Sequence, residues 1–449
     1  MDLSIVVLAA GQGTRMQSDR PKVLHEVAGL PLFAHAIRSA APLDPARIVL
    51  VAGHGADAVE AAARDIDETI VTVRQEDRLG TAHAVLQARD ALAGAGGVTA
   101  VLYGDTPFIR PDTLTRMADA LSGNAVAVLG FGARDPGRYG RLVMDGDELL
   151  RIVEFKDATD QERRISLCNS GVVMAPTDLL FDLCAAVGND NAAGEYYLTD
   201  IVALARARGL TATAVICDED ETLGVNSRAD LAAAEATFQA AARAALMEDG
   251  VTMTAPDTVF LAHDTHVGRD AVIEPNVVFG PGVTIETGAT IRAFSHLEGC
   301  HVSSGAVVGP FARLRPGAEL AEDVRVGNFV EVKNAVVAEG AKINHLTYVG
   351  DAEVGARANL GAGTVTCNYD GVSKHRTVIG EGAFIGSSTM LVAPVTVGAG
   401  AMTASGSVIT KDVPDGALAI GRARQETKPG HAARLMDMLR RRKAGAAKE

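Results

Sequence analysis

The first half of the chain alternates runs of β-branched apolar residues with alanine-rich segments of helical period. The runs SIVVLAA, RIVLVAG, TIVTV and VTAVLYGD begin at residues 4, 47, 69 and 98. Between them, FAHAIRSAA, AVEAAARD and TAHAVLQARDAL have the apolar spacing of helices. Strands that alternate with helices in this way predict an α/β domain with a mostly parallel, Rossmann-like sheet. Ligands of such domains bind at the carboxyl ends of the strands.

An alanine-rich segment ends this half of the chain. Within it, Leu231, Phe238 and Leu246 recur at helical spacing, and Gly250 follows as a stop. We therefore predict an α/β domain over residues 1–227, a connecting helix over 228–249, and a second domain with a C-terminal tail over 250–449.

Beyond residue 250 the apolar period changes to six. The aliphatic positions are Val267, Ile273, Phe279, Ile285, Ile291 and Leu297, then Val302, Val308, Leu314, Leu320, Val326 and Val332. They continue through Val337, Ile343, Val349, Val354 and Leu360, and then through Ile379, Ile385, Leu391, Val397, Thr403 and Ile409. In the series from Val302 to Val332, each aliphatic residue is followed four positions later by a small or β-branched residue. These residues are Ala306, Ala312, Ala318, Val324, Val330 and Val336. A period of six predicts a left-handed parallel β-helix with three flat faces and these side chains inside.

One segment interrupts the period of six. GAGTVTCNYDGVSKHRTV lies between Leu360 and Ile379, and we expect it to leave the β-helix as a loop or irregular coil. Because the repeats place aliphatic side chains inside, chemistry in this half must come from an outer face or from such a loop.

The segment LAAGQGTRMQSDRPK, residues 8–22, follows the first apolar run. It lacks the dinucleotide fingerprint, which needs glycine or alanine where Met16 stands, and it lacks the G-K-[ST] of a Walker loop. Glycines let backbone N–H groups face phosphates, and Arg15 and Lys22 can neutralise a triphosphate and a departing pyrophosphate. With Pro21 included, the segment resembles the signature L-x-x-G-x-G-T-R-M-x4-P-K of the sugar-nucleotide pyrophosphorylases.

Further motifs extend this resemblance over nearly the whole chain. They are QEDRLGTAHA, LYGDTP, YGRLV, IVEFKDAT, CNSGV, GEYYLTDI and GVNSR, followed by GPFARLRPGAEL, GNFVEVKN, NHLTYVGDAEVG, NLGAGTVTCNYDG, IGSSTMLVAP and AIGRARQ. In this order they resemble the family of bifunctional N-acetylglucosamine-1-phosphate uridyltransferases and glucosamine-1-phosphate N-acetyltransferases. That family makes UDP-N-acetylglucosamine for the bacterial cell envelope, with acetylation first and uridylation second.

The resemblance implies a uridyltransferase site in the first half. Its binding residues are Leu8, Ala9, Ala10, Gly11, Lys22, Gln75, Gly80, Thr81, Tyr103, Gly104, Asp105, Gly140, Glu154, Asn169 and Asn226. Of these, Gly140, Glu154 and Asn169 hold the sugar, and Asp105 and Asn226 bind Mg²⁺, which prefers hard oxygen ligands. Arg15 and Lys22 have catalytic roles, because the in-line transfer from UTP needs positioning and charge stabilisation.

The resemblance implies an acetyltransferase site in the second half. The sugar-phosphate ligands are Arg315, Lys333, Tyr348 and Asn359, and the acetyl-CoA site has Ala362, Asn368, Tyr369, Ser387, Ser405 and Arg422. His345 matches the general base. A base is needed because the amine of glucosamine-1-phosphate is largely protonated near neutral pH and must lose a proton to attack the thioester.

The substrates implied are UTP, N-acetylglucosamine-1-phosphate, glucosamine-1-phosphate and acetyl-CoA, and the resemblance implies a homotrimer. Two alternatives remain open. A single-activity pyrophosphorylase with an oligomerising or regulatory β-helix would leave His345 and Lys333 unexplained. A scaffold without catalysis would be expected to lack Arg15, Lys22 or Asp105, and all three are present.

The composition of the chain restricts the classes of ligand and the cellular compartment. The 56 acidic and 42 basic residues leave a net charge of −14, which argues against a nucleic-acid binder. The five cysteines are widely spaced, as expected in a reducing cytosol. Because the N-terminus has no basic region and no apolar run reaches the length of a membrane span, we predict a cytoplasmic protein.

Overall fold

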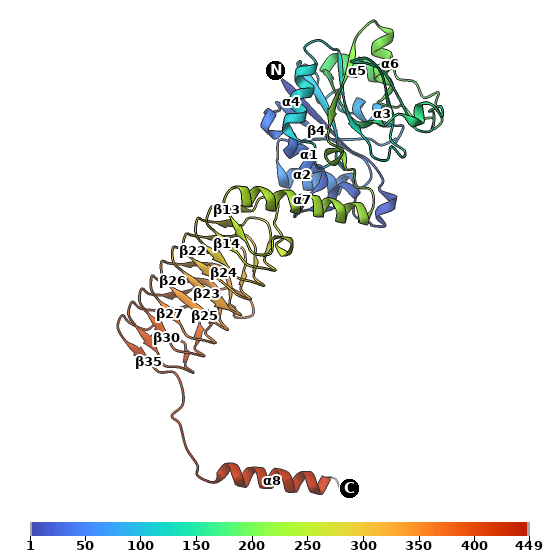
Figure 1. Cartoon of the computed structure of the whole chain (residues 1–449). Helices are drawn as coiled ribbons and strands as arrows, with labels where there is room; N and C mark the ends of the chain where they lie inside the picture. Colours follow the sequence, from blue (N-terminus) through green and yellow to red (C-terminus); the bar gives the residue numbers. More distant parts are fainter. Residues whose placement is uncertain (1, 447–449) are drawn as a thin grey trace. The chain divides into compact units, whose positions relative to one another are not determined.

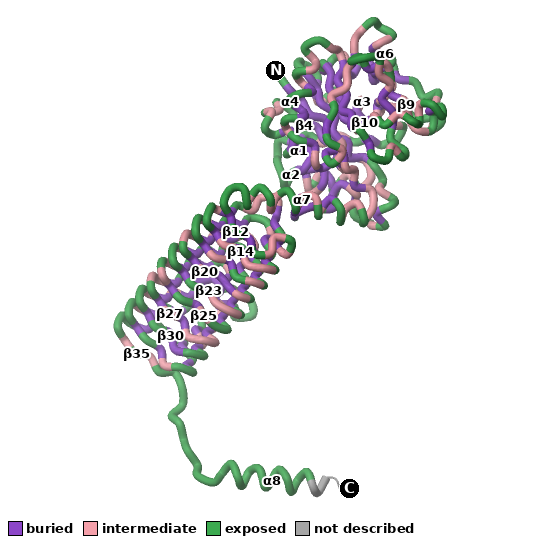
Figure 2. Tube along the Cα trace, viewed as in Figure 1, coloured by how far each residue is buried: buried purple, intermediate pink, exposed green. Residues whose placement is uncertain are grey.

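A computed structural model describes residues 2–446 of the chain. These residues form two compact units, each with its own buried interior (Figures 1 and 2). The first unit contains the described residues up to Ala244 together with Leu261–His263, and the second contains Ala245–Phe260 and the described residues from Asp264 onward.

A nine-stranded sheet forms the centre of the first unit, in the order β5-β4-β1-β6-β10-β7-β11-β9-β8. The strands are β1 (Leu3–Ala9), β4 (Arg47–Ala52), β5 (Val71–Arg74), β6 (Val98–Tyr103), β7 (Val126–Gly132), β8 (Arg141–Asp145), β9 (Glu148–Val153), β10 (Leu167–Pro176) and β11 (Ala212–Cys217). Neighbours from β5 to β6 are parallel, as are β7 and β11, while β10 runs antiparallel between β6 and β7. The predicted Rossmann-like sheet is therefore confirmed, with one reversed strand at its centre.

Helices cover both faces of this sheet. They are α1 (Leu32–Ala40), α2 (Ala56–Ile66), α3 (Thr81–Leu86), α4 (Pro111–Ala120), α5 (Thr177–Ala186) and α6 (Asp200–Ala207), and α7 (Arg228–Glu248) follows. A hairpin of β2 (Glu26–Val27) and β3 (Leu30–Pro31) and the short helices η1 (Thr14–Met16), η2 (Lys22–Leu24), η3 (Ala41–Leu43), η4 (Glu162–Arg164) and η5 (Glu219–Thr222) complete the unit.

Strand β1 shows why its sequence is an unbroken apolar run. Ile5 and Val7 pack in one hydrophobic cluster, whereas Val6 and Leu8 pack in another on the opposite face. A strand that is buried on both faces needs apolar residues at every position.

The helix predicted over residues 81–92 is shorter than expected, because α3 ends at Leu86. The amides of Gln87, Ala88 and Arg89 bond to carbonyls three residues back rather than four. The tighter hydrogen bonding turns the chain out of the α-helix, a frequent way for helices to end.

The second unit is a parallel β-helix in which each strand pairs with the equivalent strands of the coils before and after it. One sheet contains β12 (Thr252–Met253), β14 (Val272–Ile273), β17 (Thr290–Ile291), β20 (Val307–Val308), β23 (Arg325–Asn328), β25 (Lys342–His345), β27 (Asn359–Leu360), β30 (Phe384–Ile385), β33 (Met402–Thr403) and β35 (Leu418–Ala419). The other strands are β13 (His266–Val267), β15 (Val278–Phe279), β16 (Thr284–Ile285), β18 (His296–Leu297), β19 (Cys300–Val302), β21 (Arg313–Leu314), β22 (Ala318–Leu320), β24 (Glu331–Val337), β26 (Tyr348–Val354), β28 (Val365–Cys367), β29 (Thr377–Ile379), β31 (Met390–Val392), β32 (Val395–Val397) and β34 (Val408–Ile409). The short helix η6 (Pro256–Thr258) precedes them, and the helix α8 (His431–Ala446) follows.

The interior of the β-helix contains every member of the predicted six-residue series. Among the small or β-branched residues that follow the second series, Val336 is the exception, because the residue is 50% exposed. Leu314 and Ala318 are four residues apart, but their register partners Val332 and Ala335 are only three apart. This corner is one residue shorter, so Ala335 takes the interior position and Val336 turns outward.

The predicted excursion over residues 361–378 is also smaller than expected. Its ends, β28 and β29, stay in the β-helix, so the segment that leaves it is the connection between Cys367 and Thr377. Within it Asp370 accepts hydrogen bonds from the amides of Val372 and Ser373, which give the loop a defined turn.

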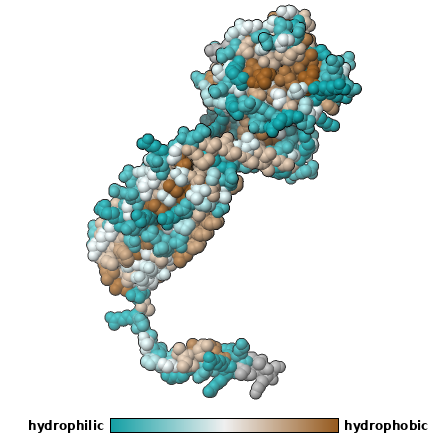
Figure 3. Space-filling model, in the orientation of Figure 1, coloured by the Kyte–Doolittle hydropathy of each residue, from teal (hydrophilic) through white to brown (hydrophobic). Residues whose placement is uncertain are grey.

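The helix α8 is exposed at every residue whose side chain is described. Leu435, Met436, Met438 and Leu439 are apolar and exposed, and three arginines follow them directly. Figure 3 shows these residues as neighbouring brown and teal areas. In the described part of the chain, no helix has both the length and the apolar character of a membrane span, and all five cysteines are free thiols.

Candidate active sites

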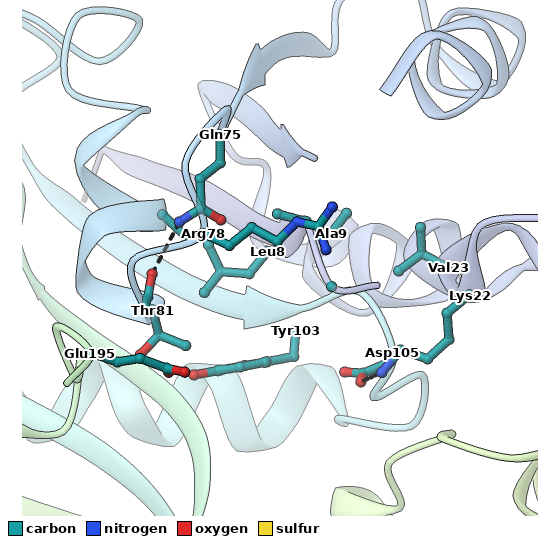
Figure 4. A pocket seen from close by; sticks show the side chains of 14 residues that line it. Leu8, Ala9, Lys22, Val23, Gln75, Arg78, Thr81, Tyr103, Asp105 and Glu195 are labelled. Carbon is teal, nitrogen blue, oxygen red and sulfur yellow. Dashed lines mark hydrogen bonds and ion pairs between the residues drawn. The ribbon is translucent and has the colours of Figure 1, made fainter. Parts of the chain in front are cut away.

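A cavity of about 310 Å³ opens at the carboxyl ends of β1 and β6, where the sequence predicts a ligand. Its lining includes the predicted residues Leu8, Ala9, Ala10, Gly11, Lys22, Gln75, Gly80, Thr81, Tyr103 and Asp105, and also Val23, Arg78, Ala84 and Glu195 (Figure 4). The structure thus brings ten of the predicted nucleotide residues together from four separate stretches of sequence.

Lys22 bridges the two predicted metal ligands. Its Nζ donates hydrogen bonds to a carboxylate oxygen of Asp105 and, at 3.1 Å, to Oδ1 of Asn226. The two oxygens therefore point to one place, which the ammonium occupies. Only 10% of the Lys22 side chain and 20% of the Asp105 side chain are exposed. A carboxylate and an amide oxygen that converge in this way fit a hard cation, and Mg²⁺ commonly takes one or two protein ligands and completes its shell with water and phosphates.

The first turn of α7 fixes the second of these ligands. A carboxylate oxygen of Asp230 accepts hydrogen bonds from the backbone amides of Asn226 and Ser227, at 3.0 and 2.9 Å. In return, the Asp230 backbone amide donates a 3.2 Å hydrogen bond to the Ser227 hydroxyl oxygen. This reciprocal capping holds the Asn226 side chain at the start of a helix, a rigid position for a ligand.

The three predicted sugar residues lie beside one another, with Gly140 directly before β8, Glu154 directly after β9 and Asn169 within β10. The Asn169 amide donates to the Gly140 carbonyl at 2.9 Å, and Glu154 Oε1 accepts from the Thr199 hydroxyl at 3.3 Å. A Cβ atom added to Gly140 would lie 3.5 Å from Glu154 Oε1 and 3.6 Å from the Asn169 Cβ. Gly140 therefore leaves open the space that its two predicted partners face.

Burial raises the pKa of Glu154 above the ordinary carboxyl value, and the charges of Asp157 and Asp200 raise it further. The folded protein then binds this proton more tightly than the unfolded chain, so the free energy of unfolding falls as the pH rises from the ordinary to the raised pKa. We expect Glu154→Gln to remove this dependence and to stabilise the protein most at neutral and higher pH. Thermal unfolding of both proteins over a series of pH values measures the difference.

Glu162 provides a control of opposite sign for that experiment. Hydrogen bonds from Thr159 and the Arg151 guanidinium lower the pKa of Glu162 to about 2. Its contribution to stability is fully present above the ordinary carboxyl pKa and is lost as the pH falls from that value toward about 2. Glu162→Gln should therefore destabilise the protein at neutral pH. A stability gain in Glu154→Gln that does not change with pH would contradict a raised pKa of Glu154.

Gly80 has a backbone conformation that other residues avoid. Its φ is +121°, and a Cβ atom there would lie 2.5 Å from the Tyr196 carbonyl oxygen. We expect Gly80→Ala to destabilise the first unit by about 1–3 kcal/mol, because strain and a backbone clash add. Denaturant unfolding measures the loss. Gly94→Ala is the matched control, since its φ is +69° but nothing lies within 4 Å of the added atom, and equal losses in the two variants would contradict the role of Tyr196.

Other predicted residues lie outside the wall of this cavity. Arg15 is exposed on η1, and Gly104 follows Tyr103 behind the lining. Two lining residues, Arg78 and Glu195, were not singled out from the sequence, although both lie within motifs of the resemblance. Their motifs were visible, but which of their side chains face a cavity depends on the fold.

His345 ends strand β25 at a corner of the β-helix and is exposed. Its Nδ1 lies 3.0 Å from Oδ1 of Asn328, its register partner in β23. Because an amide oxygen accepts, Nδ1 carries the ring proton and Nε2 is free to accept another. Asn328 was missed in the sequence analysis, although it precedes His345 by 17 residues, about one coil.

Two of the predicted sugar-phosphate ligands lie on either side of strand β24, Arg315 directly after β21 and Tyr348 at the start of β26. Arg315 donates to Glu331 Oε1 at 2.8 Å, and Glu331 is the register partner of Tyr348. Asn359 lies instead on β27, opposite Lys342 of β25.

Lys333 belongs to a second group on the same strands. The amine of Lys374 lies beside it and lowers the pKa of Lys333 below its ordinary value. Burial of Asp351 opposes its ionisation, but hydrogen bonds from the amides of Asn334 and Asn368 hold its pKa below the usual range. A carboxylate, two amines and two amides therefore meet where the interrupted coil leaves the β-helix.

The predicted acetyl-CoA residues divide between a column and the loop. Ala362, Ser387 and Ser405 occupy equivalent corners of successive coils, since the Ala362 carbonyl accepts from Ser388 and the Ser387 carbonyl from Gly406, both at 2.7 Å. His345 lies at the same corner one coil earlier, where its carbonyl accepts from Gly363 at 3.2 Å. At the other end of the column, Cδ of Arg422 would lie 3.9 Å from a Cβ atom added to Gly406. Tyr369 is exposed and lies in the loop that follows β28.

Comparisons with known proteins match both halves of the chain. The model of the MobA-like NTP transferase domain matches residues 5–167, and the bacterial transferase hexapeptide (six repeats) model matches 264–299 and 376–411. A protein of Cereibacter sphaeroides curated as "Bifunctional protein GlmU" is 70% identical over 447 residues, which cover 100% of this chain and 98% of that protein. The protein of the same name from another strain is 69% identical over 438 residues (98% and 96%), and the one from Ruegeria pomeroyi is 66% identical over 449 residues (100% of both).

Proposed function

This chain belongs to the GlmU family of bifunctional uridyltransferase and acetyltransferase enzymes of UDP-N-acetylglucosamine synthesis, and we propose that each of its two units performs one of the two reactions. The observation that carries this division is the pair of separate sites: a glycine-lined cavity with paired Lys22 and Asp105 in the first unit, and an exposed histidine with a free Nε2 in the second.

In the first unit, N-acetylglucosamine-1-phosphate attacks the α-phosphorus of UTP in line, and pyrophosphate leaves. The uridine nucleotide occupies the cavity beside Gln75, Gly80 and Thr81, and the sugar lies against Gly140, Glu154 and Asn169. The ammonium of Lys22 and the guanidinium of Arg15 stabilise the charge of the departing pyrophosphate. Most of the acceleration comes from positioning and from such fixed charges.

Asp105 and Asn226 are proposed to hold Mg²⁺. The support is the convergence of their side-chain oxygens on one cationic group, the ammonium of Lys22. When bound there, Mg²⁺ supplies charge neutralisation at the phosphates. Lys22 is then free to turn from Asp105 toward the phosphate oxygens.

In the second unit, His345 takes a proton from the amine of glucosamine-1-phosphate at Nε2 while its Nδ1–H stays bonded to Asn328. The amine forms a bond to the acetyl carbonyl carbon, and the thiolate of CoA leaves and is protonated. Arg315, Lys333, Tyr348 and Asn359 bind the sugar phosphate. Acetyl-CoA lies along the column that contains Ala362, Ser387 and Ser405 and reaches Arg422, with Asn368 and Tyr369 at its side.

We further propose a cytoplasmic homotrimer. Support for self-association is an exposed aromatic ladder on the β-helix, made of Phe294, Phe311 and Phe329. Their rings stack at 4.9 and 5.3 Å, and the side chains are between 46% and 57% exposed. A contiguous exposed apolar patch is a common mark of a protein interaction surface. The free thiols are what a reducing compartment would leave.

The two activities are tested in one mixture of protein, glucosamine-1-phosphate, acetyl-CoA, UTP and Mg²⁺, with free CoA and pyrophosphate followed separately. Both products are expected, and pyrophosphate only when acetyl-CoA is included. Pyrophosphate without any CoA would favour a single-activity pyrophosphorylase instead, and the absence of both products would contradict the proposal.

A further inference from the structure

Gln75 contributes a buried side-chain amide to the lining of the nucleotide cavity, with 6% of the residue exposed. Its Nε2 lies 3.1 Å from the Gly80 carbonyl oxygen and 3.0 Å from Nδ1 of His83. A carbonyl oxygen only accepts hydrogen bonds, so the contact with Gly80 identifies this atom as the NH₂ group and excludes the flipped amide.

The second proton of this NH₂ group points to His83, which lies on α3. Because this NH₂ group donates, Nδ1 of His83 is the acceptor of the contact. The other ring nitrogen lies 3.3 Å from Nε2 of Gln87, whose amide donates to the His83 carbonyl at 2.9 Å. A doubly protonated ring would therefore oppose an N–H to an amide NH₂ on both sides. Of the two ring contacts, the shorter one, in which Nδ1 accepts from the amide of buried Gln75, is the hydrogen bond.

With both amide protons engaged, only Oε1 of Gln75 remains for a ligand. Figure 4 shows this oxygen pointing away from Thr81, on the side of the cavity where Leu8 and Arg78 lie. Oε1 of Gln75 therefore presents a hydrogen-bond acceptor of fixed orientation to a nucleobase in this cavity. An acceptor of this kind favours a base edge with an N–H and disfavours one with a lone pair, because two acceptors that face each other leave both without a partner.

Resting on the uridyl transfer proposed above, we propose that His83 is a positioning residue that sets base specificity. By accepting the second amide proton, it keeps Oε1 of Gln75 toward the N3–H of uracil and against the unprotonated N3 of cytosine. Without that acceptor, only the Gly80 carbonyl still opposes a turned amide, so turning the NH₂ group toward cytosine costs one hydrogen bond fewer.

The test compares His83→Leu, which removes the acceptor, with His83→Asn, whose Oδ1 can reach the place of Nδ1. The values of kcat/KM for uridyl transfer are measured with UTP, CTP and 5-methyl-UTP in the full-length enzyme. We expect the UTP to CTP ratio to fall about tenfold in His83→Leu, since one hydrogen bond to a buried amide has roughly that effect. His83→Asn should restore the ratio.

The third nucleotide separates positioning from general damage. 5-Methyluracil keeps its N3–H, so its ratio to UTP should not change in His83→Leu. A UTP to CTP ratio equal to that of the wild type, or an equal loss with all three nucleotides, would overturn the proposal. If His83→Leu fails to fold, His83→Ala gives the same prediction. A wild-type protein without uridyl transfer would instead contradict the proposed function.

Discussion

Replacement of His345 by alanine is expected to lower acetyl transfer by roughly 10²–10⁴-fold and to leave uridyl transfer unchanged. The reason is chemical: without Nε2 no group at this corner takes the proton of the attacking amine. The Nδ1 bond to Asn328 shows that the ring is already oriented, so its loss removes a prepared base. Release of CoA and release of pyrophosphate, each measured with its own substrates, report the two activities.

His296→Ala is the matched control for this variant. His296 is exposed on β18 of the same β-helix and is outside the column of predicted acetyl-CoA residues. It should retain both activities. Equal losses of acetyl and uridyl transfer in His345→Ala would refute the assignment of one reaction to each unit.

Asp105→Asn is expected to lower uridyl transfer by roughly 10²–10³-fold, the usual effect of removing one fixed electrostatic group from an active site. The substitution keeps the shape and one side-chain oxygen but removes the negative charge opposite Lys22. Acetyl transfer should continue at the wild-type rate. Pyrophosphate release at increasing Mg²⁺ concentration measures the effect, and the variant should need more Mg²⁺ than the wild type for half-maximal rate.

Asp112→Asn controls for a change in net charge. Asp112 lies exposed in the first turn of α4, outside the cavity lining. If Asp105→Asn needs no more Mg²⁺ than the wild type, Asp105 does not hold the cation. If acetyl transfer falls with it, the variant has damaged the fold rather than the site.

Periodicity predicted the architecture well because each repeat carries the same information. The interior of the β-helix could be assigned from the spacing of aliphatic residues, and the one predicted interior position that failed lies where the spacing changes by a single residue. Val336 turned outward because its corner is one residue shorter, and a period cannot reveal such a step.

The contacts within the sites were beyond the reach of the sequence for a different reason. Lys22 and Asp105 are 83 positions apart, and Lys22 and Asn226 are 204 apart. Motifs proposed that these residues share a site, but only the sheet order brings the strand ends together. The bond between Gln75 and His83 spans eight residues, yet it depends on α3 beginning at Thr81 and on the backbone of Gly80. Such hydrogen bonds follow from geometry that the motif letters do not contain.

The stack of coils ends in a way that affects the two substrates of acetyl transfer differently. In a linear array, a coil in the middle is held by neighbours on both sides, while the last coil is held on one side only. The strands β34 and β35 have no described strand beyond them, and Ser405 and Arg422 lie in this terminal part. His345 lies several coils inward. Fraying on warming should therefore begin at the end that we propose to bind CoA, so acetyl-CoA should lose affinity at temperatures where the proposed base and sugar-phosphate residues are still ordered.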